Sequence, residues 1–109
     1  MGDASVDEAR LGDVANRLLF ENERVRVWEM SLEAGEASDL HRHDHEYFFV
    51  VLEGESIDAD FANGKSIRLP VKALQTFYVP PGNVETAVNR SRVRYREILI
   101  ELLEPPPGT

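Results

Sequence analysis

The stretch that decides the fold runs from Gly35 to Gly54 and reads GEASDLHRHDHEYFFVVLEG. Its residues 47–52 (YFFVVL) form a nearly continuous apolar run, which is typical of a strand that is buried on both faces. Turn sequences containing Gly35 and Gly54 lie at either end. The stretch therefore predicts a buried β-strand that begins close to a cluster of histidines.

Further short apolar runs, rich in Val, Ile, Phe and Tyr, lie on both sides of this stretch. The turn signals between them include Asn63-Gly64, the strongest short hairpin signal because both residues tolerate a positive φ, and Pro80-Pro81-Gly82. Eight strands are predicted, over residues 24–32, 40–43, 47–52, 56–61, 66–69, 74–79, 84–89 and 93–103. Such spacing predicts an all-β fold, an antiparallel sandwich or barrel with at most one short N-terminal helix.

The two ends of the chain differ from this pattern. Residues 1–17 are acidic and weakly apolar, and we expect an arm or one short helix there, followed by the barrel over 18–103. Residues 104–109 (EPPPGT) form a proline-rich tail that does not suit a sheet. The N-terminus has no basic region or apolar run, so we expect no secretory signal and a cytoplasmic protein.

Composition narrows the classes of function. The 109 residues carry 20 acidic and 12 basic side chains, a net charge of −8 that would repel phosphate backbones and anionic lipid. No apolar stretch approaches the ~18 residues of a membrane span. We therefore expect neither nucleic acid nor a membrane as a partner. The absence of cysteine excludes thiolate metal sites and cysteine nucleophiles.

All three histidines of the chain lie at alternate positions, His41, His43 and His45, followed by Tyr47. Because alternate side chains of a strand point to one face, the spacing predicts that these four groups line the same side. Crowded imidazoles repel one another when protonated, but as neutral donors they suit a divalent metal. The alternative is a solvated edge whose histidines pair with the acidic neighbours.

The same stretch resembles the first motif of the cupin family, which reads Gly, five residues, His-x-His, three or four residues, Glu, six residues, Gly. Here Gly35 is followed by EASDL and by His41-Arg42-His43, and six residues separate Tyr47 from Gly54. The resemblance implies a small single-domain cupin of the cupin 2 type, with an antiparallel β-barrel of the jelly-roll or double-stranded β-helix kind. The run RYREILIEL near the C-terminus also resembles cupins named as β-alanine degradation proteins.

The second cupin motif reads Gly, five residues, Pro-x-Gly, two residues, His, three residues, Asn. In this chain Leu74 stands at the first glycine, Pro80-Pro81-Gly82 follows five residues later, and Asn89 stands at the end. Glu85 takes the place of the family's histidine. The chain therefore resembles the family in this motif but departs from it at one turn residue and one ligand.

Mapped residue by residue, the family's four metal ligands fall on His41, His43, Tyr47 and Glu85. Two imidazoles and one carboxylate form a recognised set for one divalent metal ion, Fe, Mn, Ni or Zn, and leave positions open for water or substrate. Tyr47 is a poor ligand because a phenol has a pKa near ~10, so we expect it to donate a hydrogen bond to bound water or substrate.

Two neighbouring residues are alternatives. Glu46 is one position from the family's glutamate, and only a β-bulge would bring it to the inner face. His45 could serve as a third imidazole, lie at the rim, or act as an acid or base in catalysis.

The resemblance leaves two classes of function open. One is a metal-dependent enzyme of the oxygenase or isomerase type that acts on a small organic substrate in the barrel. The other is a non-catalytic module that binds or senses a small molecule, with or without metal.

We also expect a homodimer, because small cupins usually pair. The alternating face of Trp28, Met30 and Leu32 is either ordinary core or the subunit interface. Arg92, Arg94 and Arg96 are expected to form a solvated or salt-bridged strand face rather than the alternative, an anion site.

Overall fold

The computed structural model describes residue 12 and residues 14–104, and these form nine β-strands. The strands are β1 (Arg17–Glu21), β2 (Val25–Leu32), β3 (His41–Arg42), β4 (Tyr47–Glu53), β5 (Ser56–Phe61), β6 (Ser66–Pro70), β7 (Thr76–Val79), β8 (Val84–Val88) and β9 (Tyr95–Leu102). The predicted all-β fold is confirmed for this part of the chain. No helix within it is long and apolar enough to cross a membrane.

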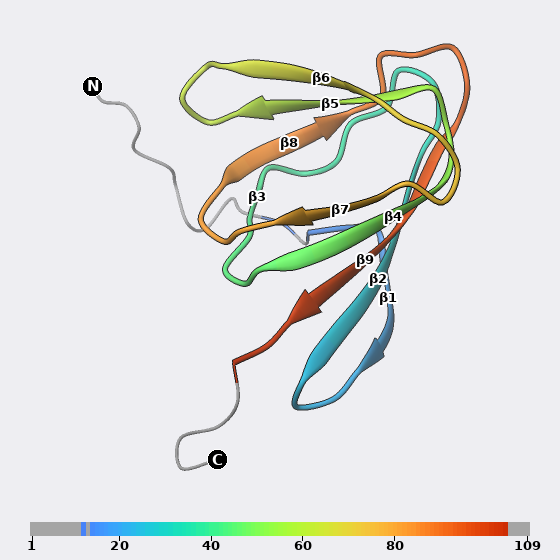
Figure 1. The fold of residues 1–109 in the computed structure, drawn as a ribbon. Helices are drawn as coiled ribbons and strands as arrows, with labels where there is room; N and C mark the ends of the chain where they lie inside the picture. Colours follow the sequence, from blue (N-terminus) through green and yellow to red (C-terminus); the bar gives the residue numbers. More distant parts are fainter. Residues whose placement is uncertain (1–11, 13, 105–109) are drawn as a thin grey trace.

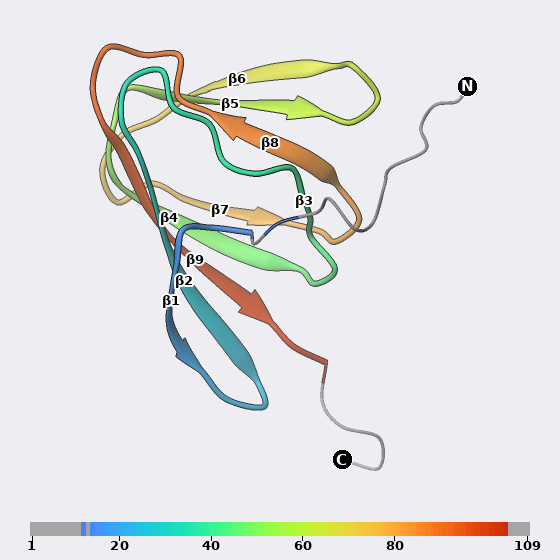
Figure 2. The same cartoon turned by 180° about the vertical axis from the view of Figure 1, so that it is seen from behind.

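The strands form two antiparallel sheets that face each other in a jelly roll (Figure 1). One sheet has five strands in the order β1-β2-β9-β4-β7, and the other has four in the order β3-β8-β5-β6. Figure 2 shows from behind that the β1–β2 end of the larger sheet extends beyond the smaller sheet. The site described below lies where β3 and β8 face β4 and β9.

The core lies between the two sheets, because alternate residues of each strand point inward. In β9 the buried positions are Tyr95, Glu97, Leu99 and Glu101, and each is followed by a partly exposed residue. Residues on the inner face of β2 and β4 add Met30, Leu32, Phe49 and Val51 to the core cluster, against which Trp28 packs. The alternating face of β2 is thus core, as the simpler of the two interpretations predicted.

The structure places all eight predicted strands within a few residues of their expected bounds and adds β1. The apolar run Leu18-Leu19-Phe20 was the signal for that strand. The strand predicted over residues 40–43 is reduced to His41–Arg42. The predicted helix or arm over residues 1–17 falls mostly outside the described residues, as does 105–109 of the predicted tail.

Five of the described residues adopt a positive φ, Gly35, Gly54, Gly64, Leu74 and Gly82, and three of them bear on the fold. Gly64, with φ 91°, closes the predicted hairpin between β5 and β6. Gly54, with φ 141°, also approaches Tyr95 so closely that a Cβ would lie 2.8 Å from the ring atom Cδ1. Leu74 takes a φ of 71° at the position where the cupin motif has glycine. Because its side chain is 77% exposed, burial of that side chain offsets little of the energetic cost of this backbone conformation.

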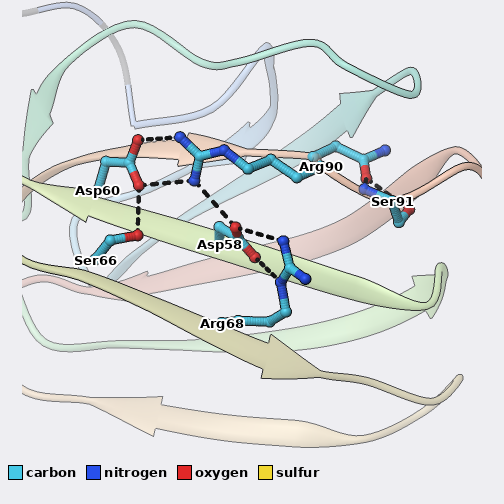
Figure 3. Close-up of polar contacts among 7 residues, drawn as sticks. Asp58, Asp60, Ser66, Arg68, Arg90 and Ser91 are labelled. Carbon is cyan, nitrogen blue, oxygen red and sulfur yellow. Dashed lines mark hydrogen bonds and ion pairs between the residues drawn. The ribbon is translucent and has the colours of Figure 1, made fainter.

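Ion pairs join β5 to β6 and to Arg90, just beyond the end of β8 (Figure 3). The buried carboxylate of Asp58 accepts hydrogen bonds from Arg68 Nε and Arg90 Nη1, both at 3.0 Å. Arg90 also reaches Asp60, with Nη2 and Oδ2 2.6 Å apart, and Ser66 donates to the same carboxylate at 2.7 Å. Since both arginine side chains are substantially exposed, solvent screens these pairs, and their role is to hold β5, β6 and the end of β8 in register.

Arginine side chains of the predicted salt-bridged face also pair with carboxylates, on the larger sheet. Arg96 Nη2 lies 2.6 Å from Glu29 Oε2, and Arg94 Nε lies 2.9 Å from Glu53 Oε1. The predicted salt-bridged face is thus confirmed for Arg94 and Arg96.

Candidate metal site

Two imidazoles and one carboxylate meet between the sheets. His41 lies directly opposite Glu85 in the β3–β8 ladder, and the backbone N–H of His43 continues this pairing by donating to the Asn83 carbonyl at 3.0 Å. The possible ligand atoms of His41, His43 and Glu85 all lie within 4.8 Å of one another. The two Nε2 atoms are 3.1 Å apart. The set predicted from the motifs is therefore brought together by the fold.

The ring of His41 is held in one orientation. Its Nδ1–H donates to the backbone carbonyl of Asp39 at 2.8 Å, which leaves the lone pair on Nε2 directed toward His43. A backbone acceptor on the far nitrogen is the usual arrangement for a metal-binding histidine, because it fixes the tautomer. Burial lowers the pKa of His41, so the imidazole stays neutral at pH 7.

The ring of His43 is equally buried, but only one of its two nitrogens has a hydrogen-bond partner among the described residues. Its imidazole stacks on the Tyr47 ring, with centroids 4.0 Å apart and an interplanar angle of 21°. Its Nδ1 is buried and has no hydrogen-bond partner among the described residues. When Nε2 of His43 carries the proton it can donate to Nε2 of His41, and Nδ1 is then a buried acceptor without a partner. A cation on Nε2 would replace that hydrogen bond and place the proton on Nδ1. Burial and the neighbouring His41 lower the pKa of His43 to about 3.

These residues fit a divalent metal ion. Two imidazole nitrogens bonded to one ion at about 2.1 Å are typically separated by roughly 3.0–3.4 Å, and the observed separation of the two Nε2 atoms is 3.1 Å. Glu85 is half-buried, and burial raises its pKa, so its carboxyl lacks a compensating charge. A cation between the three side chains would supply that charge.

Tyr47 lies beside this group on the inner face of β4. Burial and the nearby Glu85 raise the pKa of its hydroxyl far above the usual value, so the phenol keeps its proton. The structure therefore favours Tyr47 as a hydrogen-bond donor, the role expected from the sequence, over Tyr47 as a phenolate ligand.

Residues 43–46 form an irregular segment rather than a strand, which changes the position expected for His45 and leaves Glu46 outside the ligand group, as expected without a bulge. His45 was expected to share the inner face, but it is half-buried in this segment, outside the described group of ligands and outside the cavity lining. Glu46 accepts a hydrogen bond from Tyr78 at 2.9 Å instead of reaching the ligand group. Because β3 ends at Arg42, strand alternation does not extend through these residues. The catalytic role predicted for His45 stays a prediction.

Comparison with known proteins identifies the family. Residues 28–100, more than half of the chain, match the family described as "Cupin domain". This chain belongs to the cupin family. Among solved structures, this cupin is similar to a cupin domain from Bordetella pertussis Tohama I, with 22% identity, a TM-score of 0.72 and coverage of 85% of this chain and 100% of the other. It also resembles a polyketide cyclase from Streptomyces resistomycificus, at 21% identity and a TM-score of 0.58, over 79% and 59% of the two chains.

A curated relative of this cupin is auxin-binding protein 1 of Arabidopsis thaliana. The two are 28% identical over 98 residues, which is 85% of this chain and 49% of the relative. The chain spans about half the length of the curated relatives it matches. The solved structures therefore support the fold, and the curated relatives support a distant kinship.

The cupin's ligand group opens onto a cavity between the sheets of about 190 Å³. This is smaller than the roughly 300–1,000 Å³ typical of pockets for drug-sized ligands, so the cavity suits a small molecule. Aromatic rings form part of its wall, including Phe49 and Phe77, which stack at 4.9 Å.

The cavity also contains a carboxyl group that the sequence analysis missed. Glu97 is only 4% exposed and lines the cavity, and the Tyr95 hydroxyl donates to its Oε1 at 2.5 Å. Burial raises the pKa of Glu97 to about 7. The signal was the position of Glu97 in YREILIEL, where it alternates with Tyr95 and Leu99 on the inward face of the strand.

Proposed function

We propose that this cupin binds one divalent metal ion through His41, His43 and Glu85 and uses it to hold a small organic molecule in the cavity. The observation that carries the proposal is the pair of neutral Nε2 atoms 3.1 Å apart with Glu85 close by. The donor set of two imidazoles and one carboxylate is compatible with Fe, Mn, Ni or Zn.

The roles of the chain's own residues follow from their placement. When bound, the ion supplies a positive charge that polarises an oxygen of the ligand. His41 and His43 offer neutral nitrogens because burial disfavours their protonation. The protonated hydroxyl of Tyr47 is the hydrogen-bond donor beside them, and aromatic rings line part of the cavity.

Metal content of the purified protein tests the proposal. We expect near-stoichiometric divalent metal by elemental analysis, or its uptake on titration, and a loss of at least about tenfold in affinity for His41→Ala, His43→Ala and Glu85→Ala. His45→Ala is the matched control, since this imidazole lies outside the ligand group. Wild-type protein that stays metal-free when divalent ions are added would contradict the proposal.

Binding without catalysis is the second candidate, and the kinship with auxin-binding protein 1 favours it, since that relative's name describes a binding role. A metal-dependent reaction of the oxygenase or isomerase type is the alternative use of the same site. Turnover that is abolished in folded His41→Ala protein would support the enzyme. Ligand binding without turnover in the metal-loaded protein would support the binding module.

We further propose that a second copy of the chain is the cupin's protein partner. Cross-strand pairing places an apolar row along the outer face of the larger sheet, formed by Phe20, Val27, Ile100, Phe48 and Tyr78. Phe20 is 53% exposed and Tyr78 52%. Exposed apolar surface that continues across five strands is typical of a protein–protein contact.

A further inference from the structure

The cavity of this cupin has an unbalanced charge. Among the described residues that line it are three acidic side chains, Asp58, Glu85 and Glu97, and no lysine or arginine. Asp58 is compensated from outside by Arg68 and Arg90. The divalent ion proposed above would compensate Glu85. Glu97 is then the carboxyl that remains without a positive partner in the cavity.

The surroundings of Glu97 explain why its charge stays uncompensated. Its cross-strand neighbours are Met30 on β2 and Val51 on β4, which carry no charge. The Tyr95 hydroxyl donates one hydrogen bond to Oε1, whereas a carboxylate can accept several. Burial and the like charge of Glu85 raise the pKa of Glu97 to about 7, against the lowering effect of the Tyr95 hydrogen bond. A cationic group brought to this carboxyl would therefore be bound favourably.

Aromatic rings complete an environment suited to an organic cation. Phe49 is a diagonal neighbour of Glu97 on the inner face, because Phe49 pairs with Leu99, two residues along β9. Its ring stacks on Phe77, and both rings line the cavity. A carboxylate beside aromatic faces is the combination that attracts a protonated amine, since the negative face of a ring adds to the attraction of the carboxylate.

We propose that the molecule bound in this cavity carries a protonated amine, and that Glu97 is the residue that pairs with it. This inference rests on the proposed function in one respect, because it takes the cavity as the ligand-binding site. An uncharged or purely acidic ligand would leave Glu97 either protonated or charged without a positive partner, and only a cationic group would favour its carboxylate form.

A matched pair of probes tests the inference without knowledge of the natural ligand. Butylammonium and butan-1-ol have the same length and differ in charge, and their binding can be followed at pH 8 by NMR titration of the protein. We expect wild type to bind butylammonium at least about tenfold more tightly, the factor expected from one charge-assisted contact. In Glu97→Gln the preference should fall to within about twofold.

Glu101→Gln is the control variant, because Glu101 is a buried carboxyl on the same face of β9 that Trp28 and Arg26 already satisfy. This variant should keep the wild-type preference. Tyr95→Phe shows whether a loss of binding in Glu97→Gln comes from structural damage, since it removes the hydrogen bond to Glu97 but keeps the carboxylate charge. It should keep or increase the preference for butylammonium.

Measuring metal loading in the same samples separates the two proposals. A wild-type protein that loads metal but does not prefer butylammonium would overturn the inference and leave the metal site intact. A preference that survives Glu97→Gln, or that is lost equally in Glu101→Gln, would also overturn it. A preference that depends on Glu97 in protein that binds no metal would support the amine site and contradict the metal site.

Discussion

His41 and Glu85 lie directly opposite each other in the β3–β8 ladder, although they come from different motifs of the sequence. Directly paired residues bring their Cβ atoms to within about 5 Å, so this register places a carboxyl beside an imidazole. His43 completes the group from just beyond the end of β3. The substitution of glutamate for the family's histidine therefore keeps a donor in place and adds a negative charge.

That charge leads to the first prediction. Glu85→Gln keeps the size of the side chain but removes the negative charge, so divalent-ion affinity should fall by about tenfold or more. Glu85→His supplies a third imidazole and should retain metal. Isothermal titration with Mn(II) and Ni(II) measures both variants. Glu46→Gln is the control, because Glu46 binds Tyr78 instead of reaching the ligand group; equal affinity in Glu85→Gln and wild type would refute the assignment.

Glu97 should make stability depend on pH. Its pKa is raised by burial from 4.5 to about 7, so between these values the folded protein holds a proton that the unfolded chain has released. The group's contribution to stability is therefore fully present below about pH 4.5 and is lost as the pH rises through about 7. Glu97→Gln has no carboxyl to titrate, so its free energy of unfolding should not show this decrease. The difference in free energy of unfolding, variant minus wild type, should increase by on the order of 2–3 kcal/mol from pH 4.5 to pH 8. Urea unfolding at both pH values measures this, and parallel pH profiles would contradict the prediction.

The turn before β7 contains a removable strain. Leu74 holds a φ of 71° with a side chain that is 77% exposed. Leu74→Gly should raise the free energy of unfolding by about 0.5–1 kcal/mol, since glycine tolerates this φ and little buried surface is lost. Leu74→Ala is the control, because it trims the side chain but keeps a Cβ. Thermal unfolding that shows the same gain for both variants would argue against backbone strain.

Charge introduced into the apolar row of the outer sheet face should dissociate the proposed dimer. Phe48 lies between Ile100 and Tyr78 in that row and is 36% exposed, so Phe48→Glu should shift the protein to monomer without loss of the fold. Val93→Glu, at an exposed position before β9, should remain dimeric. Sedimentation velocity measures both. Monomeric wild type at high protein concentration would rule out the proposed interface.

Several features of the fold were predictable because they depend on local pattern. The apolar run of residues 47–52 and the Asn63-Gly64 turn predicted β4 and the β5–β6 hairpin, since both depend on short-range pattern. The prediction that β4 is buried on both faces was wrong, because Phe48 lies on the exposed outer face of the sheet. The rule of strand alternation also predicted that His45 points inward, and there it was wrong. Alternation assumes a continuous strand, and β3 ends at Arg42.

The sequence by itself determined that the chain forms short antiparallel strands and, through its likeness to the cupin motifs, which residues to consider as ligands. Only the tertiary structure decided which of them meet, because sheet register joins residues that are distant in the chain, as it does for His41 and Glu85. It also decided the character of Glu97, whose carboxyl is unusual only because two sheets bury it between apolar neighbours. Burial and register are properties of packing, and a strand's own sequence does not contain them.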